Sequence, residues 1–272
     1  MQAPDATAVI EAAFAEDLAY GPDYTTLATI DADAHTTAQV RARAEGIICG
    51  AVYIEHVLSD ASITTVPDGT RVRPGDVVAT IEAPTRRLLT AERTFLNLLC
   101  HLSGIATVTD QWASALAAVG NTRVRDTRKT TPGLRLLEKY AVRCGGGVNH
   151  RLGLGDAALI KDNHIAAAGS VTAAFEKVRA AYPDLACEIE VDNLEQLAEV
   201  LPLNPDVVML DNFTPAEVRQ AVEMVASQSV VLEASGGLTL DNAAEYGATG
   251  VDFVAVGELT HSARVLDLGL DF

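Results

Sequence analysis

The stretch EIEVDNLEQLAEVLPLNPDVVMLDN, residues 188–212, decides the fold class. Two candidate strands, Glu188–Val191 and Val207–Leu210, flank the amphipathic segment Leu194–Leu201. A strand, a helix and a second strand in this order predict a parallel βα unit with a buried sheet. The class of this half of the chain is therefore α/β.

The same alternation runs from about Gly104 onward. The other predicted strands are Thr122–Asp126, Ala157–Lys161, Val230–Ala234 and Phe253–Val256, and the other predicted helices are Leu134–Arg143, Val171–Ala181, Pro215–Ala226 and Asp241–Tyr246. Strands that are nearly continuous in apolar residues favour an α/β barrel over an open two-faced sheet.

The first hundred residues follow another pattern. Between Thr37 and Glu82, β-branched and polar residues alternate, with turn signals at Asp68-Gly69 and Pro74-Gly75-Asp76. This predicts an antiparallel sheet with one solvated face. Helices are expected at Asp5–Leu18 and Thr90–Leu102, with Thr90 as the N-cap of the second. Arg93 would then lie in its first turn, where the helix dipole disfavours a cation.

Charge excludes several classes of partner. The chain has 272 residues, with 20 basic and 37 acidic side chains, which gives a formal net charge of −17. Nucleic acid and anionic membranes both require a basic face, so neither is expected as a partner. No apolar run reaches the roughly 20 residues of a membrane span. An anionic ligand must therefore be bound by a local cluster of Arg and Lys.

The cysteines indicate the compartment. Cys49, Cys100, Cys144 and Cys187 are widely spaced and form no CxxC pair, so we expect reduced, mostly buried thiols and no zinc site. The N-terminal segment lacks a basic region before its apolar residues, unlike a secretory signal. A cytoplasmic location is the expectation.

Charged residues and glycines stand at the carboxyl ends of the predicted strands. These segments are Asp126–Lys129, Lys161–His164, Glu190–Asn193, Asp211–Asn212, Ser235–Gly237 and Gly257–Glu258. In a barrel these ends meet on one face, where barrel active sites are built. So many consecutive polar ends are hard to explain as helix caps, so we predict the active site there. Taken singly, Asn193 and Asn212 are expected to cap the next helices.

The predicted face carries cations, carboxylates and glycines. Guanidinium groups bind carboxylates in bidentate fashion, and ammonium groups bind carboxylate or phosphate as point charges. Neighbouring carboxylates hold Mg²⁺ or sugar hydroxyls, and glycine turns bind phosphate. Taken together, these groups predict a carboxylate-bearing polyanion and a phosphorylated sugar with a divalent metal. The candidates are Arg128, Lys129, His150, Arg151 and Lys161; Glu190 and Asp211; and Ser235, Gly236, Gly237 and Gly257. Alternatively, Glu190 is a structural ion-pair partner of Lys161, and His150 only supports other residues of the site. His164 and His261 are expected to make structural hydrogen bonds.

The run DTRKTTPGLRLLEKYAVRCGGGVNHRLGLGDAALIKDNHI, residues 126–165, resembles the signature of the quinolinate phosphoribosyltransferase family, the carboxylating nicotinate-nucleotide pyrophosphorylases. Supporting stretches are ERTFLNLLCHLSGIAT (92–107), EIEVDN (188–193), MLDNF (209–213), EASGGL (233–238) and VGELTHS (256–262). The resemblance covers nearly the whole chain. It implies an N-terminal α/β sandwich with an antiparallel sheet, residues 1–103, and an incomplete parallel TIM-like α/β barrel, residues 104–272, whose last residues may return to the first domain.

The resemblance also implies the reaction. Quinolinate and phosphoribosyl pyrophosphate (PRPP) give nicotinate mononucleotide, CO₂ and pyrophosphate with Mg²⁺, in NAD biosynthesis, within a head-to-tail homodimer. It implies that Arg93 reaches the site from the partner subunit, and that Lys129, Lys161, Glu190 and Asp211 are catalytic. Of these, Glu190 and Asp211 would bind Mg²⁺. The full implied substrate-binding set is Arg93, Thr127, Arg128, Lys129, His150, Arg151, Lys161, Glu190, Asp211, Ser235, Gly236, Gly237, Val256, Gly257 and Glu258.

Other functions share parts of this pattern. A molybdenum-associated sister group has the same fold and part of the signature, and a phosphoribosyltransferase for another base would keep the PRPP site. A barrel aldolase with Lys161 as a Schiff-base nucleophile would need the lysine and the glycines. A non-enzymatic polyanion-binding protein would keep the cations without the paired carboxylates.

Overall fold

The computed structural model describes residues 2–272, which form two compact units. The first unit contains the chain up to Asp110, together with Thr130–Gly146 and Glu258–Phe272. The second contains Gln111–Lys129 and Gly147–Gly257. Each unit is thus built from segments that are distant in sequence, and the expected domain boundary at 103/104 lies inside a continuous helix.

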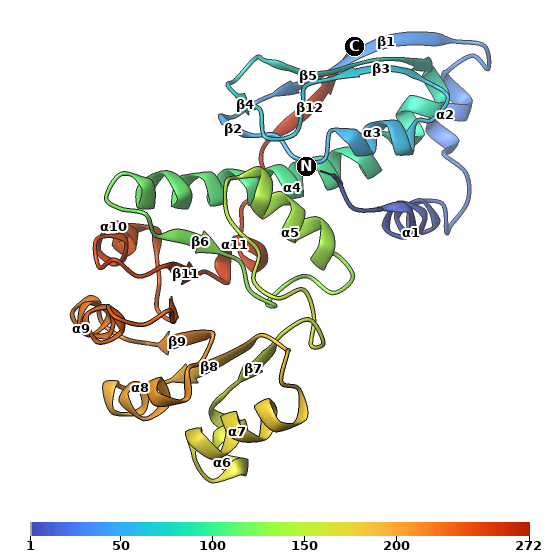
Figure 1. Cartoon of the computed structure of the whole chain (residues 1–272). Coiled ribbons are helices and arrows are strands. Elements are labelled where there is room, and N and C mark those ends of the chain that lie inside the picture. The colour runs from blue at the N-terminus through green and yellow to red at the C-terminus, as the bar shows by residue number, and fades with distance from the viewer. Residues whose placement is uncertain (1) are drawn as a thin grey trace. The chain divides into compact units, whose positions relative to one another are not determined.

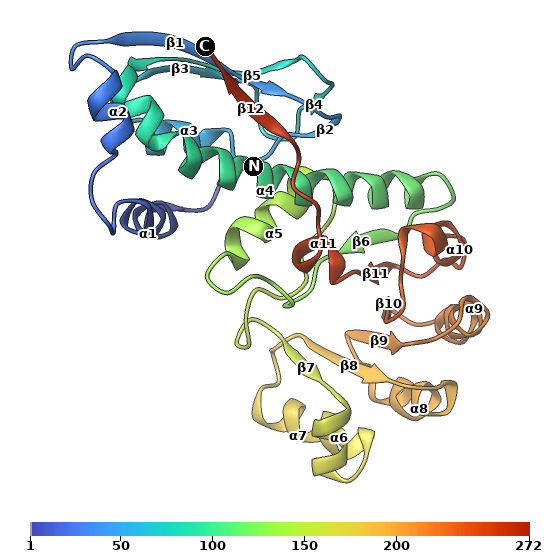
Figure 2. The same ribbon diagram turned by 180° about the vertical axis from the view of Figure 1, so that it is seen from behind.

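An antiparallel sheet forms the centre of the first unit. Its strand order is β12-β1-β5-β3, with β1 His35–Ala42, β3 Ser62–Thr65, β5 Val77–Pro84 and β12 Leu268–Asp271. Ala38, Val40 and Ala42 of β1 are buried, while the residues between them are more exposed, so the sheet has the one-sided pattern that the sequence predicts. Figure 2 shows the C-terminal strand β12 beside β1, with which it pairs antiparallel.

Helices accompany this sheet. They are α1 Thr7–Asp17, α2 Tyr24–Thr29, α3 Val52–Val57, α5 Arg135–Cys144 and α11 Glu258–His261, and a two-stranded ribbon pairs β2 Gly46–Ile47 with β4 Arg71–Val72. Within α1 only Ile10 is buried, so its other apolar residues do not form the buried face that their spacing suggests.

The long helix α4 corrects one expectation. It spans Thr85–Ala117, 33 residues, and therefore begins before Thr90. The Thr90 hydroxyl donates to Asp23 Oδ2 at 3.4 Å and is not an N-cap. Arg93 lies more than two turns after the start of α4, beyond the reach of the helix dipole. The prediction that Arg93 lies in a first turn, where the dipole disfavours a cation, was therefore wrong.

A parallel six-stranded sheet forms the second unit, with helices outside it (Figure 1). The strand order is β6-β11-β10-β9-β8-β7, so β6 and β7 are edges and the barrel is not closed. This confirms the incomplete α/β barrel. The strands are β6 Arg123–Arg125, β7 Ala158–Ile160, β8 Cys187–Val191, β9 Val207–Asp211, β10 Val231–Ser235 and β11 Phe253–Ala255.

The helices of this unit match the predicted ones with one addition. They are α6 Asp162–Ala168, α7 Val171–Ala181, α8 Leu194–Val200, α9 Pro215–Val225 and α10 Ala243–Gly247, with 3-10 turns η1 Leu201–Leu203 and η2 Leu240–Asn242. Helix α6 was not predicted because DNHIAAA is too short to show helical periodicity. Across residues 2–272, no helix is both long and apolar enough to cross a membrane.

Candidate active site

The register of the parallel sheet determines which side chains share a face. Glu190 pairs with Met209, and Met209 pairs with Glu233. Because successive side chains of a strand point to opposite faces, Glu188 lies on the face of Glu190, and Asp211 on that of Met209. Carboxylates from β8, β9 and β10 therefore converge on one face of the sheet.

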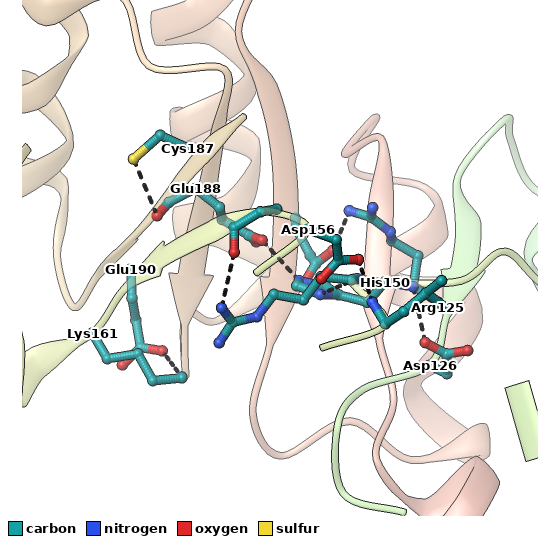
Figure 3. A network of polar contacts seen from close by, with 12 residues as sticks. Arg125, Asp126, His150, Asp156, Lys161, Cys187, Glu188 and Glu190 are labelled. Atoms are coloured by element: carbon teal, nitrogen blue, oxygen red, sulfur yellow. Dashed lines mark hydrogen bonds and ion pairs between the residues drawn. The ribbon is translucent and has the colours of Figure 1, made fainter. Parts of the chain in front are cut away.

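Lys161 and Glu190 form an ion pair on this face (Figure 3). Lys161 directly follows β7, and its Nζ donates to Oε2 of Glu190, which is almost completely buried. The Lys161 backbone N–H donates to Nδ1 of His164 at 3.0 Å and closes the first turn of α6. His164 thus has the hydrogen-bonding role that the sequence allowed, and it orients the segment that presents Lys161.

Asp211 adds a second carboxylate at the end of β9. Burial raises its pKa, and the nearby charge of Glu190 raises it further. The ammonium groups of Lys161 and Lys129 act in the opposite direction, so Glu190 and both lysines lie within electrostatic reach of Asp211. Two carboxylates and two ammonium groups, brought from separate strand ends, form the cluster that the sequence predicted.

Arg128 and Arg151 form a cationic pair nearby. Burial lowers the pKa of Arg151, and the like charge of Arg128 lowers it further. Among the described residues, the buried Nε atoms of both guanidinium groups have no hydrogen-bond partner, although Arg151 Nη1 donates to the Ala157 carbonyl at 3.0 Å. Two adjacent guanidinium groups with unused donors are suited to bind carboxylates.

A buried polar network lies beside these cations (Figure 3). His150 Nε2 lies 2.7 Å from Glu188 Oε2 and 3.5 Å from Glu233 Oε1, and Arg125 Nη1 donates to Glu233 Oε2 at 2.7 Å. Glu188, Glu233 and Arg125 are not among the residues predicted from the sequence. The available signal was the spacing of Glu188 and Glu190, which places two carboxylates on one face of a buried strand.

Backbone groups fix His150 within this network. Its Nδ1 accepts from the Arg151 N–H at 2.7 Å, and its own N–H donates to Asp126 Oδ1 at 2.8 Å. Because Nδ1 is an acceptor, the ring proton lies on Nε2, facing the two carboxylates. Burial, with the charge of Glu188, raises the pKa of Glu233 to about 7.

The glycine turn after β10 is sterically constrained. Gly236 has φ +87°, and a Cβ at this position would lie 2.2 Å from Asn212 Oδ1. Asn212 itself adopts φ +56° and donates to the Asp211 carboxylate at 2.7 Å. It therefore does not cap α9, whose N-cap is Thr214, whereas Asn193 does cap α8 as expected.

The remaining predicted residues occupy varied positions. Thr127 Oγ1 accepts from the Lys129 N–H at 3.0 Å and shapes the segment after β6. The Val256 N–H donates to the Arg125 carbonyl at 2.9 Å, next to Gly257. Arg93 has a side chain that is 66% exposed, and Glu258 begins α11; both belong to the first unit. The substrate contacts predicted for these residues stay predictions.

These features define the class of protein. Barrel strands present clustered cations, paired carboxylates and a glycine turn on one face, which is the arrangement of an α/β-barrel enzyme that acts on anionic, phosphorylated substrates. The family models for the N- and C-terminal domains of quinolinate phosphoribosyl transferase match residues 23–103 and 105–271. The chain therefore belongs to the quinolinate phosphoribosyltransferase family.

Individual relatives agree with this assignment. The carboxylating nicotinate-nucleotide pyrophosphorylase of Mycobacterium leprae is 52% identical over 271 residues, covering 96% of this chain and 95% of the relative. A probable enzyme of the same name from Bacillus subtilis is 41% identical, with 95% and 90% coverage. The solved nicotinate-nucleotide pyrophosphorylase of Ehrlichia chaffeensis superposes with a TM-score of 0.94 at 35% identity and covers 99% of both chains.

Proposed function

We propose that this enzyme transfers the phosphoribosyl group of PRPP to the ring nitrogen of quinolinate and releases CO₂ and pyrophosphate. The product is nicotinate mononucleotide, a precursor of NAD. The observation that carries the proposal is the adjacent guanidinium pair of Arg128 and Arg151, in the same unit of a strongly acidic chain as the Glu190 and Asp211 carboxylates. Names of the relatives support the same reaction.

The guanidinium groups bind quinolinate. Its two adjacent carboxylates match the adjacent cations Arg128 and Arg151, whose buried Nε–H groups gain acceptors when the substrate binds. His150 is held beside them with its proton on Nε2 and orients the Arg151 backbone. These contacts position the pyridine nitrogen for attack on C1 of the ribose.

Lysines and glycines bind PRPP. Lys129 and Lys161 stabilise the charge that develops on the departing pyrophosphate. The carboxylates of Glu190 and Asp211 accept hydrogen bonds from the ribose hydroxyls. Backbone N–H groups of Ser235, Gly236 and Gly237, with the Val256–Glu258 segment, hold the 5′-phosphate.

A magnesium ion fits the same carboxylates. Glu190 and Asp211 supply hard oxygen donors, and a divalent cation would offset both the burial of Asp211 and its repulsion by Glu190, which together raise the Asp211 pKa. When bound, Mg²⁺ neutralises pyrophosphate charge.

Decarboxylation follows from the product of the first step. Alkylation of the ring nitrogen places a positive charge next to the carbon that bears the 2-carboxylate. When that carboxylate leaves as CO₂, the charge stabilises the electron pair left on the ring. The enzyme needs no covalent nucleophile, and its contribution is to hold the carboxylate among fixed cations.

A homodimer completes the proposal. The exposed Arg93 of one subunit supplies a further cation to the site of its partner in a head-to-tail dimer. A cytoplasmic location is part of the proposal and is supported by the free state of Cys49, Cys100, Cys144 and Cys187.

The test is quinolinate-dependent turnover with PRPP and Mg²⁺. Loss of quinolinate absorbance is followed together with release of CO₂ and pyrophosphate, and we expect the two products in equal amounts. Release of pyrophosphate without CO₂ would support the PRPP site but contradict quinolinate as the acceptor of the phosphoribosyl group. Absence of both products in folded, Mg²⁺-replete protein would overturn the proposed reaction.

A further inference from the structure

Two cysteines that are distant in sequence meet in the first unit. Cys49 follows β2, and Cys144 is the last residue of α5. Their sulfur atoms and one carboxylate oxygen of Asp68 all lie within 4.8 Å of one another. Both thiols are free.

The two thiols differ in access. Cys49 is completely buried. Cys144 is partly exposed and lines a cavity of about 450 Å³, together with Asp68, Tyr140 and Arg143. A small reagent that enters this cavity therefore meets Cys144 first.

Asp68 is not available as a metal ligand. Its Oδ1 accepts from the Ala51 N–H at 2.9 Å, and its Oδ2 accepts from the Gly50 N–H at 3.0 Å and the Tyr140 hydroxyl at 2.8 Å. These bonds anchor the chain that carries Cys49. The chemistry of the cluster is consequently that of its two thiols.

The surroundings assign different roles to the thiols. A hydrogen bond from Cys49 is the main cause that lowers the pKa of Cys144, and the positive charge of Arg143 acts in the same direction, against burial and Asp68. Burial raises the pKa of Cys49. Burial also raises the pKa of the neighbouring Tyr53 hydroxyl, so the surroundings of Cys49 disfavour a negative charge. Cys144 is thus the nucleophile, and Cys49 remains a thiol.

We infer that Cys49 and Cys144 form a reactive dithiol that hydroperoxides oxidise to a reversible disulfide. The Cys144 thiolate attacks one peroxide oxygen, the O–O bond breaks, and the other oxygen takes a proton and leaves as water or alcohol. The Cys49 sulfur then attacks the resulting sulfenic acid, and the hydroxyl leaves as a second molecule of water with the Cys49 proton. The two sulfurs are oxidised and the peroxide is reduced.

Closure requires the sulfur atoms to approach to about 2.05 Å. The two sulfur atoms already lie within 4.8 Å of one another, so closure requires a movement of less than about 3 Å, which rotation of the two side chains supplies.

The experiment treats the whole wild-type protein with hydrogen peroxide, blocks the remaining thiols with N-ethylmaleimide in denaturant, and maps peptides by mass spectrometry. We expect one intramolecular Cys49–Cys144 disulfide that dithiothreitol reverses, while the buried Cys187 stays a thiol. Full maleimide labelling of Cys49 and Cys144 after peroxide would overturn the inference. A disulfide from Cys144 to any other cysteine would also overturn it.

Variants test the assigned roles. In Cys49→Ser the hydroxyl keeps a hydrogen-bond donor beside Cys144, but sulfenic acid on Cys144 has no thiol to react with, so we expect dimedone labelling to rise about tenfold over wild type. In Cys187→Ser, the matched control, the Cys49–Cys144 disulfide forms as in wild type. Dimedone labelling of Cys144 at the wild-type level in folded Cys49→Ser would contradict the role of Cys49.

Discussion

The Nε2 atom of His150 lies 2.7 Å from Oε2 of Glu188, and both side chains are almost completely buried. This contact fixes the plane of an imidazole whose other nitrogen accepts from the backbone of Arg151. Glu188 therefore positions two residues of the proposed quinolinate site without being part of the predicted set.

Replacement of Glu188 tests this positioning. Glu188→Gln keeps the side-chain volume but removes the charge opposite His150. We expect the free energy of unfolding to fall by about 1–3 kcal/mol and kcat/KM for quinolinate to fall about tenfold or more. Denaturant titration and steady-state kinetics measure the two effects. The exposed Glu195→Gln of α8 serves as the control, and equal kinetics in the two variants would contradict the role of Glu188.

Glu233 makes stability depend on pH. Its pKa is raised to about 7 from an ordinary value of 4.5, so between these values the folded protein binds more protons than the unfolded chain. The free energy of unfolding therefore decreases as pH rises through this window, and the stabilisation present below pH 4.5 is lost above about pH 7. Unfolding curves across pH 5–8 should show this slope in wild type, and Glu233→Gln should flatten it. An unchanged slope in the variant would assign the dependence to another group.

Gly236 is expected to resist substitution for two separable reasons. In Gly236→Ala the new Cβ meets both a left-handed backbone and Asn212 Oδ1 at 2.2 Å. Gly75→Ala, with φ +95° and no atom within 4 Å, carries only the backbone cost and is the matched control. We expect Gly75→Ala to lose about 1 kcal/mol of stability and Gly236→Ala to lose more, with a raised KM for PRPP. Equal losses and unchanged KM would exclude a steric role for this turn.

Arg93 tests the shared site. Because its side chain is exposed, Arg93→Ala should change the free energy of unfolding by no more than about 0.5 kcal/mol, yet it should abolish turnover. Mixing it with inactive Lys161→Ala in equal amounts under subunit exchange should restore about a quarter of wild-type activity. Half of the dimers are then mixed, and each mixed dimer has one intact site of two. Arg219→Ala on the exposed side of α9 should retain full activity in the same assays. Mixed dimers without recovered activity would contradict a site made by two subunits.

Nicotinate tests recognition of the second carboxylate. It lacks the group that would pair with one guanidinium, and it leaves the buried Nε–H of that guanidinium without an acceptor. We expect kcat/KM at least about 10³-fold below that for quinolinate. Comparable turnover of both acids would show that Arg128 and Arg151 do not recognise paired carboxylates.

The sequence predicted the barrel well because its signals are local. Apolar runs of strand length separated by amphipathic segments gave β8, α8 and β9 to within about one residue, apart from the 3-10 turn after α8. Because the carboxyl ends of parallel strands meet at one edge of the sheet, the polar residues at these ends were expected to lie close together. Lys161, Glu190 and Asp211 do so.

The missed features depend on tertiary contacts. No local signal distinguishes Thr85 from Thr90 as the start of α4, because the whole stretch favours a helix and Thr90 instead contacts Asp23. Glu233 lies inside an apolar strand, and its ion pair with Arg125 forms only when β10 and β6 lie in the same sheet. An acidic residue inside a predicted buried strand therefore indicates a charged partner on another strand of the same barrel.

The pairing of β12 with β1 has a consequence for biosynthesis. The two strands pair Gln39 with Asp271 and Ala42 with Leu268, so an edge of the N-terminal sheet is supplied by residues translated after the entire barrel. Until β12 is synthesised, β1 has an unpaired backbone edge. Such an edge can pair with a strand of another chain and start aggregation. The first unit therefore completes its sheet only after the whole second unit has been synthesised.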